Sequence, residues 1–187
     1  MNGNSRFAAV LMTGLFLSGS VSATDIWVAG SGSNSTGDGS SSLPWRTITK
    51  AMDEAGPGDV IKVKTGTYNV NAGESFPITI KSEVSIRGDE SDVEDWPRIG
   101  GDVNVSSSTA AEALFFVNAT SADFDEADIE SLYFVGEDSS GKDAPSALRV
   151  LVRNGWTAVV NVENIRCERP QMKDSGHTDR STILLDG

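Results

Sequence analysis

The chain has 187 residues and a formal net charge of −12, from 27 acidic and 15 basic side chains. A surface this acidic repels phosphate backbones, which argues against nucleic-acid binding, and it would repel an anionic polysaccharide unless a divalent cation bridged the two. Cys167 is the only cysteine, so no intramolecular disulfide can form and stability must come from packing and backbone pairing.

Residues 1–23 have the features of a signal peptide. An apolar run at 7–16 follows one basic residue, and Val21 and Ala23 occupy the −3 and −1 positions of a signal-peptidase site. We expect cleavage between Ala23 and Thr24, and hence a secreted, periplasmic or cell-surface protein. The apolar run is shorter than the about 20 residues that cross a bilayer, and no later segment is longer, so the chain is not expected to span a membrane.

Residues 24–58 are expected to form an N-terminal unit of strand, polar loop and helix. A short strand at 26–28 precedes a Gly/Ser/Asn/Asp-rich loop at 29–43, which is too polar to hold a core. A helix is predicted over 47–55, because the apolar residues of this stretch recur with helical spacing and share one face. These residues are Ile48, Ala51, Met52 and Ala55.

A turn is expected directly after this helix. Gly56 is predicted to end the helix in the left-handed conformation, which glycine adopts without steric cost. Pro57 and Gly58 then suit the two central positions of a type II turn, which would lead the chain into its next strand.

From residue 59 onward the sequence consists of short alternating strands separated by turn residues. Ile61 and Val63 alternate with Lys62 and Lys64, which predicts one buried and one solvated face. The same alternation predicts strands within 78–81, 84–89, 102–105, 113–118, 128–136, 146–155 and 181–187. These strands are short, near the low end for globular domains.

Two stretches, beginning at Ala113 and at Ala147, look like copies of each other. Their offset of 34 residues falls within the range of solenoid repeats. With the short strands, this favours a β-solenoid over a sandwich, with 59–187 forming its coils. The helix at 47–55 would cap the first coil or, alternatively, pack on the side of a sheet. The C-terminal strand at 181–187 would leave an open edge, which either continues into further coils or pairs with a partner, including a second copy.

Cys167 is expected to be buried. If the chain bends at Glu163 and Asn164, alternation places the thiol on the inward face with Val162 and Ile165. A buried thiol that acts as a small hydrophobe is favoured over a nucleophile.

Residues 25–69 carry a strand, a loop with Gly-Asp-Gly, Pro-Trp-Arg-Thr-Ile, a helix, Gly-Asp and Gly-Thr-Tyr. This order resembles the N-terminal module of secreted right-handed parallel β-helix proteins of the pectate-lyase-like superfamily. The resemblance implies an all-β fold, a right-handed parallel β-helix with an N-terminal capping α-helix. It implies function less directly, because the superfamily includes lyases, hydrolases, epimerases and adhesins. Its lyases typically use calcium held by aspartates and a Lys or Arg base, but no catalytic residue can be carried over.

The densest carboxylate cluster includes Asp123, Asp125 and Asp128, together with Glu126 and Glu130. Calcium binds six to eight oxygens, so these aspartates are candidate metal ligands and calcium the candidate cofactor. The alternative is a solvated loop between strands, because the spacing departs from that of a calcium-binding EF-hand.

Two arginines and two tryptophans complete the candidates. Arg149 and Arg153 share an outward face, where one of them would serve as the base that removes a proton next to a uronate carboxylate; the alternative is a pair of surface charges. Trp96 and Trp156 lie in turn-like segments and are candidate stacking platforms for sugar rings, or else cover coil corners.

The sequence therefore predicts a secreted β-helix that contacts polysaccharide or serves as a structural module at the cell envelope. The alternative is a calcium-dependent, pectate-like polysaccharide lyase acting by β-elimination. Whether the chain is an enzyme at all is left open by these residues.

Overall fold

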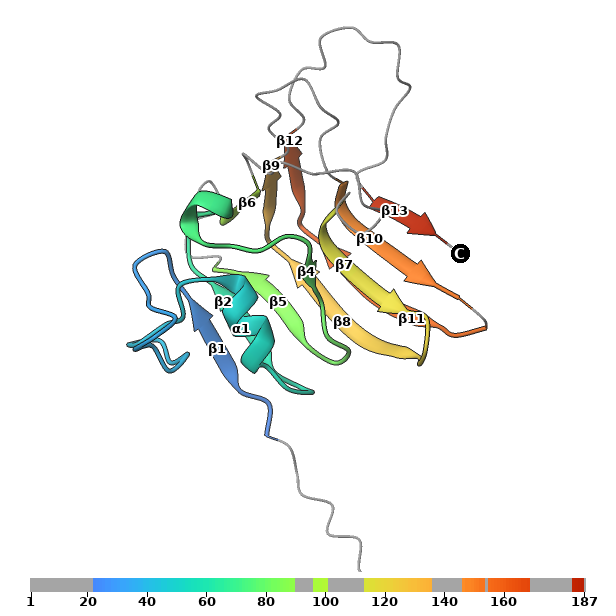
Figure 1. Ribbon diagram of the computed structural model, residues 1–187, viewed down its shortest axis with the longest axis horizontal. Helices are drawn as coiled ribbons and strands as arrows, with labels where there is room; N and C mark the ends of the chain where they lie inside the picture. The colour runs from blue at the N-terminus through green and yellow to red at the C-terminus, as the bar shows by residue number, and fades with distance from the viewer. Residues whose placement is uncertain are drawn as a thin grey trace, which may run out of the picture.

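The computed structural model describes residues 22–89, 96–100, 113–135, 146–153, 155–168 and 183–186 (Figure 1). Most of the predicted signal peptide and the expected strand at 102–105 lie outside these ranges. The described residues form thirteen β-strands, one α-helix and one short 3-10 helix, η1 (Val70–Ala72). No helix among them is long and apolar enough to cross a membrane.

The strands form three sheets, and every strand pairs in parallel with its neighbours. In spatial order, sheet A contains β1 (Asp25–Val28), β2 (Val60–Val63), β5 (Ser85–Gly88), β8 (Phe124–Glu130) and β11 (Ala158–Glu163). Sheet B contains β3 (Thr67–Tyr68), β6 (Arg98–Gly100), β9 (Tyr133–Val135) and β12 (Arg166–Glu168). Sheet C contains β4 (Ile78–Thr79), β7 (Ala113–Ala119), β10 (Ser146–Val152) and β13 (Ile183–Asp186).

The order of the strands along the chain makes the fold a parallel β-solenoid. The chain visits sheet C, then A, then B, and repeats this circuit in three complete coils: β4–β5–β6, β7–β8–β9 and β10–β11–β12. Each coil stacks on the one before it, as Figure 1 shows. The fold class predicted from the short alternating strands is therefore confirmed.

The register between coils corrects the predicted repeat length by one residue. Phe115 pairs with Leu148 and Phe134 with Cys167, an offset of 33 residues rather than 34. Matching Ala113 to Ala147 followed the similarity of the two sequences. Pairing the strands with that offset would shift their register by one residue and turn every side chain of one strand to the opposite face. Burial therefore decides the register.

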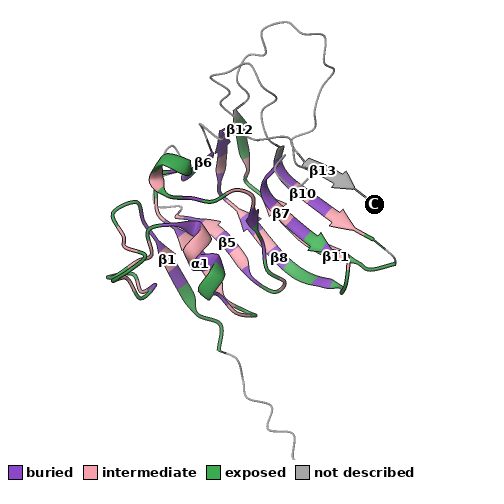
Figure 2. Cartoon of the chain, viewed as in Figure 1, coloured by how far each residue is buried: buried purple, intermediate pink, exposed green. Residues whose placement is uncertain are grey.

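The core lies inside the coils, where inward side chains from all three sheets meet. Alternation places Ile61, Val63 and Ile86 at zero exposure. Phe115 and Phe134 pack edge to face with ring centroids 5.1 Å apart. Buried positions alternate with partly exposed ones along the strands in Figure 2.

Helix α1 (Ile48–Glu54) lies at the N-terminal end of this core and packs against β1, β2 and β4. It precedes β2 as β4 precedes β5, so it takes the place of a sheet C strand in the first, partial coil. The four apolar residues predicted to share one face are all buried. The helix was thus predicted correctly, and it covers the end of the core.

The predicted end of the helix is right in position but wrong in detail. Ala55 ends it in an extended conformation with ψ 143°, and Gly56 is not left-handed. The carboxylate of Asp59 instead accepts a hydrogen bond from the Gly56 N–H at 2.9 Å. Gly58 has φ +87° and Asp59 donates to the Gly56 carbonyl, as the predicted type II turn requires.

Candidate functional site

Sheet A combines an apolar inner row with a charged outer row. Residues in register across its five strands form an inward ladder: Ile26, Ile61, Ile86, Ile129 and Val162. The residue after each of these points to the opposite face, because side chains alternate along a strand. The core packing that fixes the inner ladder therefore also fixes the outward one.

The outward ladder, which we call the outer row, consists of Trp27, Lys62, Arg87, Glu130 and Glu163. Its members come from β1, β2, β5, β8 and β11 in that order. An aromatic ring and two cations thus occupy the N-terminal side of the face, and two carboxylates occupy the C-terminal side.

A hollow of about 310 Å³ lies over the N-terminal part of the outer row. Its lining residues are Asp25, Trp27, Lys62, Arg87, Gly88, Asp89 and Glu130. Gly88 is needed there, because a Cβ at this position would lie 2.0 Å from the Ser131 carbonyl oxygen. The next coil therefore passes so close to Gly88 that no side chain fits between them.

Arg87 is held by two carboxylates of the next strand. Its guanidinium lies 3.0 Å from Asp128 Oδ2 and 3.2 Å from Glu130 Oε2. Hydrogen bonds from Asn161 and then from Arg87 lower the pKa of Asp128, outweighing the opposing effect of burial. Asp128 is therefore ionised at neutral pH, and the charge of Arg87 is compensated within the sheet.

Lys62 differs from Arg87 in this respect. It forms no ion pair or side-chain hydrogen bond with any residue that the structure describes. Its strand neighbour Lys64 lies over the Trp27 ring, with Nζ 5.2 Å from the ring centroid, and donates to the Ser41 carbonyl at 3.3 Å. Lys62, unlike Lys64, lines the hollow, so its ammonium group is available to a ligand there.

The predicted calcium ligands lie on two different parts of the surface. Asp123 is in the corner before β8, where its Oδ1 accepts hydrogen bonds from Thr157 N at 2.8 Å and Thr157 Oγ1 at 2.9 Å. Asp125 is exposed at the start of β8, whereas Asp128 lies on the outer face beside Arg87. Within the described ranges, no three His, Cys, Asp or Glu side chains are grouped so that they could hold a metal ion.

The predicted base and stacking residues are also dispersed. Arg149 is half-buried on β10 of sheet C, and Arg153 is exposed just after that strand. Trp156 follows in the same corner with 38% of its surface exposed, next to the segment that Asp123 binds. Trp96 lies before β6 and is partly covered by the Arg166 guanidinium, 4.6 Å from the ring centroid. The structure thus places Trp156 beside Thr157, which contacts Asp123, whereas Arg149, Asp128 and Trp96 lie elsewhere. The Arg153 carbonyl accepts from Trp156 N, and no contact joins the described Arg153 to Asp123.

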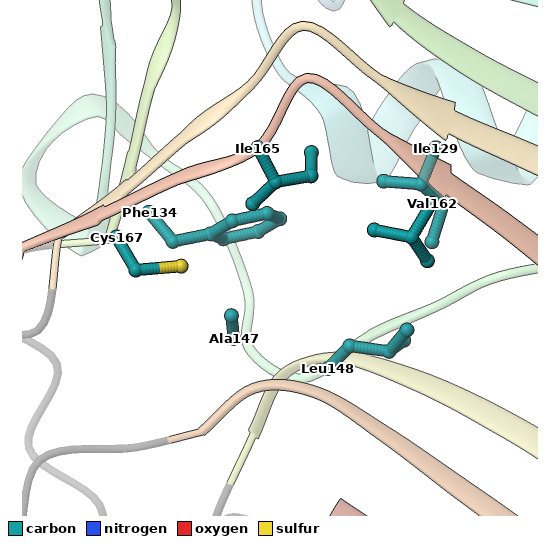
Figure 3. Close-up of a pocket in the computed structure, with 7 residues that line it drawn as sticks. All are labelled: Ile129, Phe134, Ala147, Leu148, Val162, Ile165 and Cys167. Atoms are coloured by element: carbon teal, nitrogen blue, oxygen red, sulfur yellow. The ribbon is translucent and has the colours of Figure 1, made fainter. Parts of the chain in front are cut away.

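A second hollow, of about 330 Å³, lies inside the last complete coil (Figure 3). Side chains from all three sheets point into it: Ile129, Phe134, Ala147, Leu148, Val162, Ile165 and Cys167. Its lining is apolar apart from the Cys167 thiol, so it is a widened part of the core and offers no acid–base pair.

Cys167 corrects one prediction. The bend at Asn164, with φ +51°, is present, and the thiol faces the inner hollow with Ile165 as expected. The residue is nevertheless exposed rather than buried. Its strand β12 is the outermost strand of sheet B among the described residues.

Residues 28–122 match a family model described as "Protein of unknown function (DUF1565)". The match covers just over half of the 187 residues, so the chain belongs to this family. A search of curated proteins found no match. The matched range contains Lys62 and Arg87, and the family description assigns them no activity.

Proposed function

We propose that this member of the DUF1565 family is an exported β-solenoid module that binds polysaccharide on the outer face of sheet A without cleaving it. Export rests on the signal-peptide features of residues 1–23. The observation that carries the binding proposal is the 310 Å³ hollow, in which an indole ring, several carboxylates and an ammonium group with no ion pair among the described residues meet.

These groups suit the chemistry of a sugar. An indole presents a flat apolar surface on which the C–H face of a sugar ring can stack. Carboxylates such as those of Asp25 and Asp89 accept hydrogen bonds from hydroxyl groups, and Lys62 supplies a donor. A concave site with an aromatic wall and a few converging polar groups is the usual form of a small-molecule site.

The shape of the face favours a polymer over a compact ligand. Neighbouring strands lie about 4.8 Å apart, so an extended chain laid along the solenoid axis meets one outward side chain of the outer row at each strand. Successive sugar rings would then contact successive coils.

Binding is favoured over the lyase alternative by the positions of the candidate residues. Arg149 lies on sheet C and Arg153 in the corner after it, whereas Asp128 lies on the outer face of sheet A. Arg87, the arginine within the hollow, is already paired with two carboxylates and is suited to holding the hollow's shape.

Affinity gel electrophoresis against a broad panel of neutral and acidic polysaccharides tests the proposal. We expect at least one polysaccharide to retard the protein, and Trp27→Ala or Lys62→Ala to weaken retention about tenfold, because each removes a group facing the hollow. Trp156→Ala, a matched loss of an exposed indole elsewhere, should leave retention unchanged.

Two outcomes would overturn this. One is retention by no polysaccharide, and the other is retention that survives both Trp27→Ala and Lys62→Ala in correctly folded variants. Ultraviolet absorbance from unsaturated uronate products, lost on addition of a chelator, would support the lyase instead.

A further inference from the structure

The charged side chains that line the hollow on sheet A have both signs, and carboxylates outnumber cations. The three carboxylates and two cations are Asp25, Asp89, Glu130, Lys62 and Arg87. Asp128, which is not part of the lining, adds a further carboxylate through its contact with Arg87. A ligand in the hollow is therefore surrounded by a net negative charge.

The two cations differ in how far their charge is already compensated. Arg87 lies 3.0 Å from Asp128 Oδ2 and 3.2 Å from Glu130 Oε2, so two carboxylates match its single positive charge. Lys62 has no ion pair within the described ranges, and neither has Asp25, which is exposed at the start of β1. The ammonium group of Lys62 and the carboxylate of Asp25 are thus open to a ligand.

These two open groups lie on different sides of Trp27. Asp25 precedes Trp27 by two residues on β1, about 7 Å away along the strand. Lys62 is the register partner of Trp27 on β2, about 4.8 Å away across the sheet. A sugar ring stacked on the indole therefore has an acceptor beside it along the strand and a donor beside it across the sheet.

The lining as a whole offers a sugar more acceptors than donors. An ionised carboxylate accepts hydrogen bonds at both oxygens and donates none, whereas an ammonium group only donates. Glu130 can still accept while it contacts Arg87, because each carboxylate oxygen has two lone pairs. A ligand that matches this lining must supply mainly donors, and the hydroxyl groups of a sugar are such donors.

We propose that the hollow selects a neutral polysaccharide with free ring hydroxyl groups and discriminates against O-acetylated and uronate-bearing chains. This inference rests on the proposed function and specifies its ligand. An acetyl ester replaces an O–H donor by a group that only accepts, which leaves carboxylates of the lining without a partner. A uronate adds a negative charge to a lining that is already negative overall, and Lys62 alone does not offset this repulsion.

Affinity gel electrophoresis with matched polysaccharides tests the inference. Xylan, glucomannan and mixed-linkage β-glucan are each used unsubstituted and after chemical O-acetylation, and polygalacturonate and alginate represent uronate chains. We expect at least one unsubstituted neutral polysaccharide to retard the protein, with an apparent dissociation constant about tenfold lower than that of its acetylated form. The uronate chains should give no retardation at low salt, and added salt should leave the retardation by neutral chains unchanged.

One substitution tests the carboxylates directly. Asp25→Asn keeps the size of the side chain but replaces a charged acceptor by an amide, so it should weaken binding of the unsubstituted neutral polysaccharide about threefold. It should also narrow the difference between the free and acetylated forms, because the amide N–H groups can donate to an ester carbonyl. Asp53→Asn removes the same charge from an exposed position on α1 outside the hollow, and this matched control should change neither.

The outcomes are distinguishable. If polygalacturonate or alginate retards the protein more than every neutral polysaccharide, or if acetylated forms bind as tightly as unsubstituted ones, the inferred selectivity is wrong and glycan binding stands. The same conclusion follows if Asp25→Asn behaves like Asp53→Asn. If no polysaccharide retards the protein, both proposals fail together.

Discussion

At its N-terminal end the inward side chains of the solenoid are fully covered, whereas in its last complete coil the described inward side chains are less buried and line a hollow. Ile48 on α1 has no exposed surface and Met52 has 3%. At the other end, Ile165 is half-buried and Cys167 is exposed beside the 330 Å³ hollow. A solenoid interior is thus continuous, and each end needs a cover of its own.

Closing an end with a helix requires partners for the helix N-terminus, whose first N–H groups have none within the helix. Glu74 supplies them from a distant loop: its carboxylate accepts hydrogen bonds from Ile48 N at 2.6 Å, Thr49 N at 3.0 Å and Thr49 Oγ1 at 2.6 Å. Thr47 Oγ1 accepts from Lys50 N and from the Asn34 side chain. The polar loop at 29–43 therefore serves the cap.

The largest expected effect is on the free energy of unfolding, when the same truncation of isoleucine to alanine is made at each end of the solenoid. Ile48→Ala should lower the free energy of unfolding by about 3–4 kcal/mol, because it leaves a cavity in a closed part of the core. Ile165→Ala should lower it by only about 1 kcal/mol, since that side chain is half-buried at the open hollow. Urea denaturation of both variants measures the difference, and equal losses would contradict the contrast between the ends.

A smaller effect is expected at the polar part of the cap. Glu74→Ala should lower the free energy of unfolding by about 2 kcal/mol, because it leaves the donors of Ile48 and Thr49 without their acceptor. Glu74→Gln should lower it less, since the amide oxygen still accepts. Thermal or urea unfolding at neutral pH compares the two.

The same residue gives a pH dependence. Burial raises the pKa of Glu74 above its ordinary 4.5, against the opposing effect of the Thr49 and Ile48 hydrogen bonds. The folded chain then binds the Glu74 proton more tightly than the unfolded chain, so this contribution to stability is full below pH 4.5 and declines as pH rises through the folded pKa. The stability of the natural chain relative to Glu74→Gln should therefore improve from neutral pH to about pH 4. A relative loss on acidification would show that the hydrogen bonds outweigh burial.

Local pattern predicted much of the fold. The amphipathic helix at 47–55 and the inward pairs Ile61 and Val63, and Val84 and Ile86, follow from periodicity alone, because burial of one face determines them. The predicted repeat offset was one residue too long, because the similar sequences that begin at Ala113 and Ala147 do not show which side chains enter the core.

The candidate site could not be predicted in the same way. Trp27 pairs with Lys62, Lys62 with Arg87, and Arg87 with Glu130, at sequence separations of 35, 25 and 43 residues. Loops of unequal length remove any period from these spacings, so only the pairing of strands shows that the residues share a row. Dense carboxylates and isolated tryptophans were visible in the sequence, but density along the chain does not imply convergence in space.

The most direct test of the account uses the four tryptophans, Trp27, Trp45, Trp96 and Trp156. Each indole N–H gives its own signal in a ¹⁵N–¹H NMR spectrum, and single substitutions assign them. On titration with a fragment of the polysaccharide that retards the protein, the account predicts a progressive, saturable shift of the Trp27 signal, with Trp96 and Trp156 unchanged. A shift of Trp156 or Trp96 with Trp27 unmoved would place binding away from the hollow on sheet A and contradict the proposed function of this face.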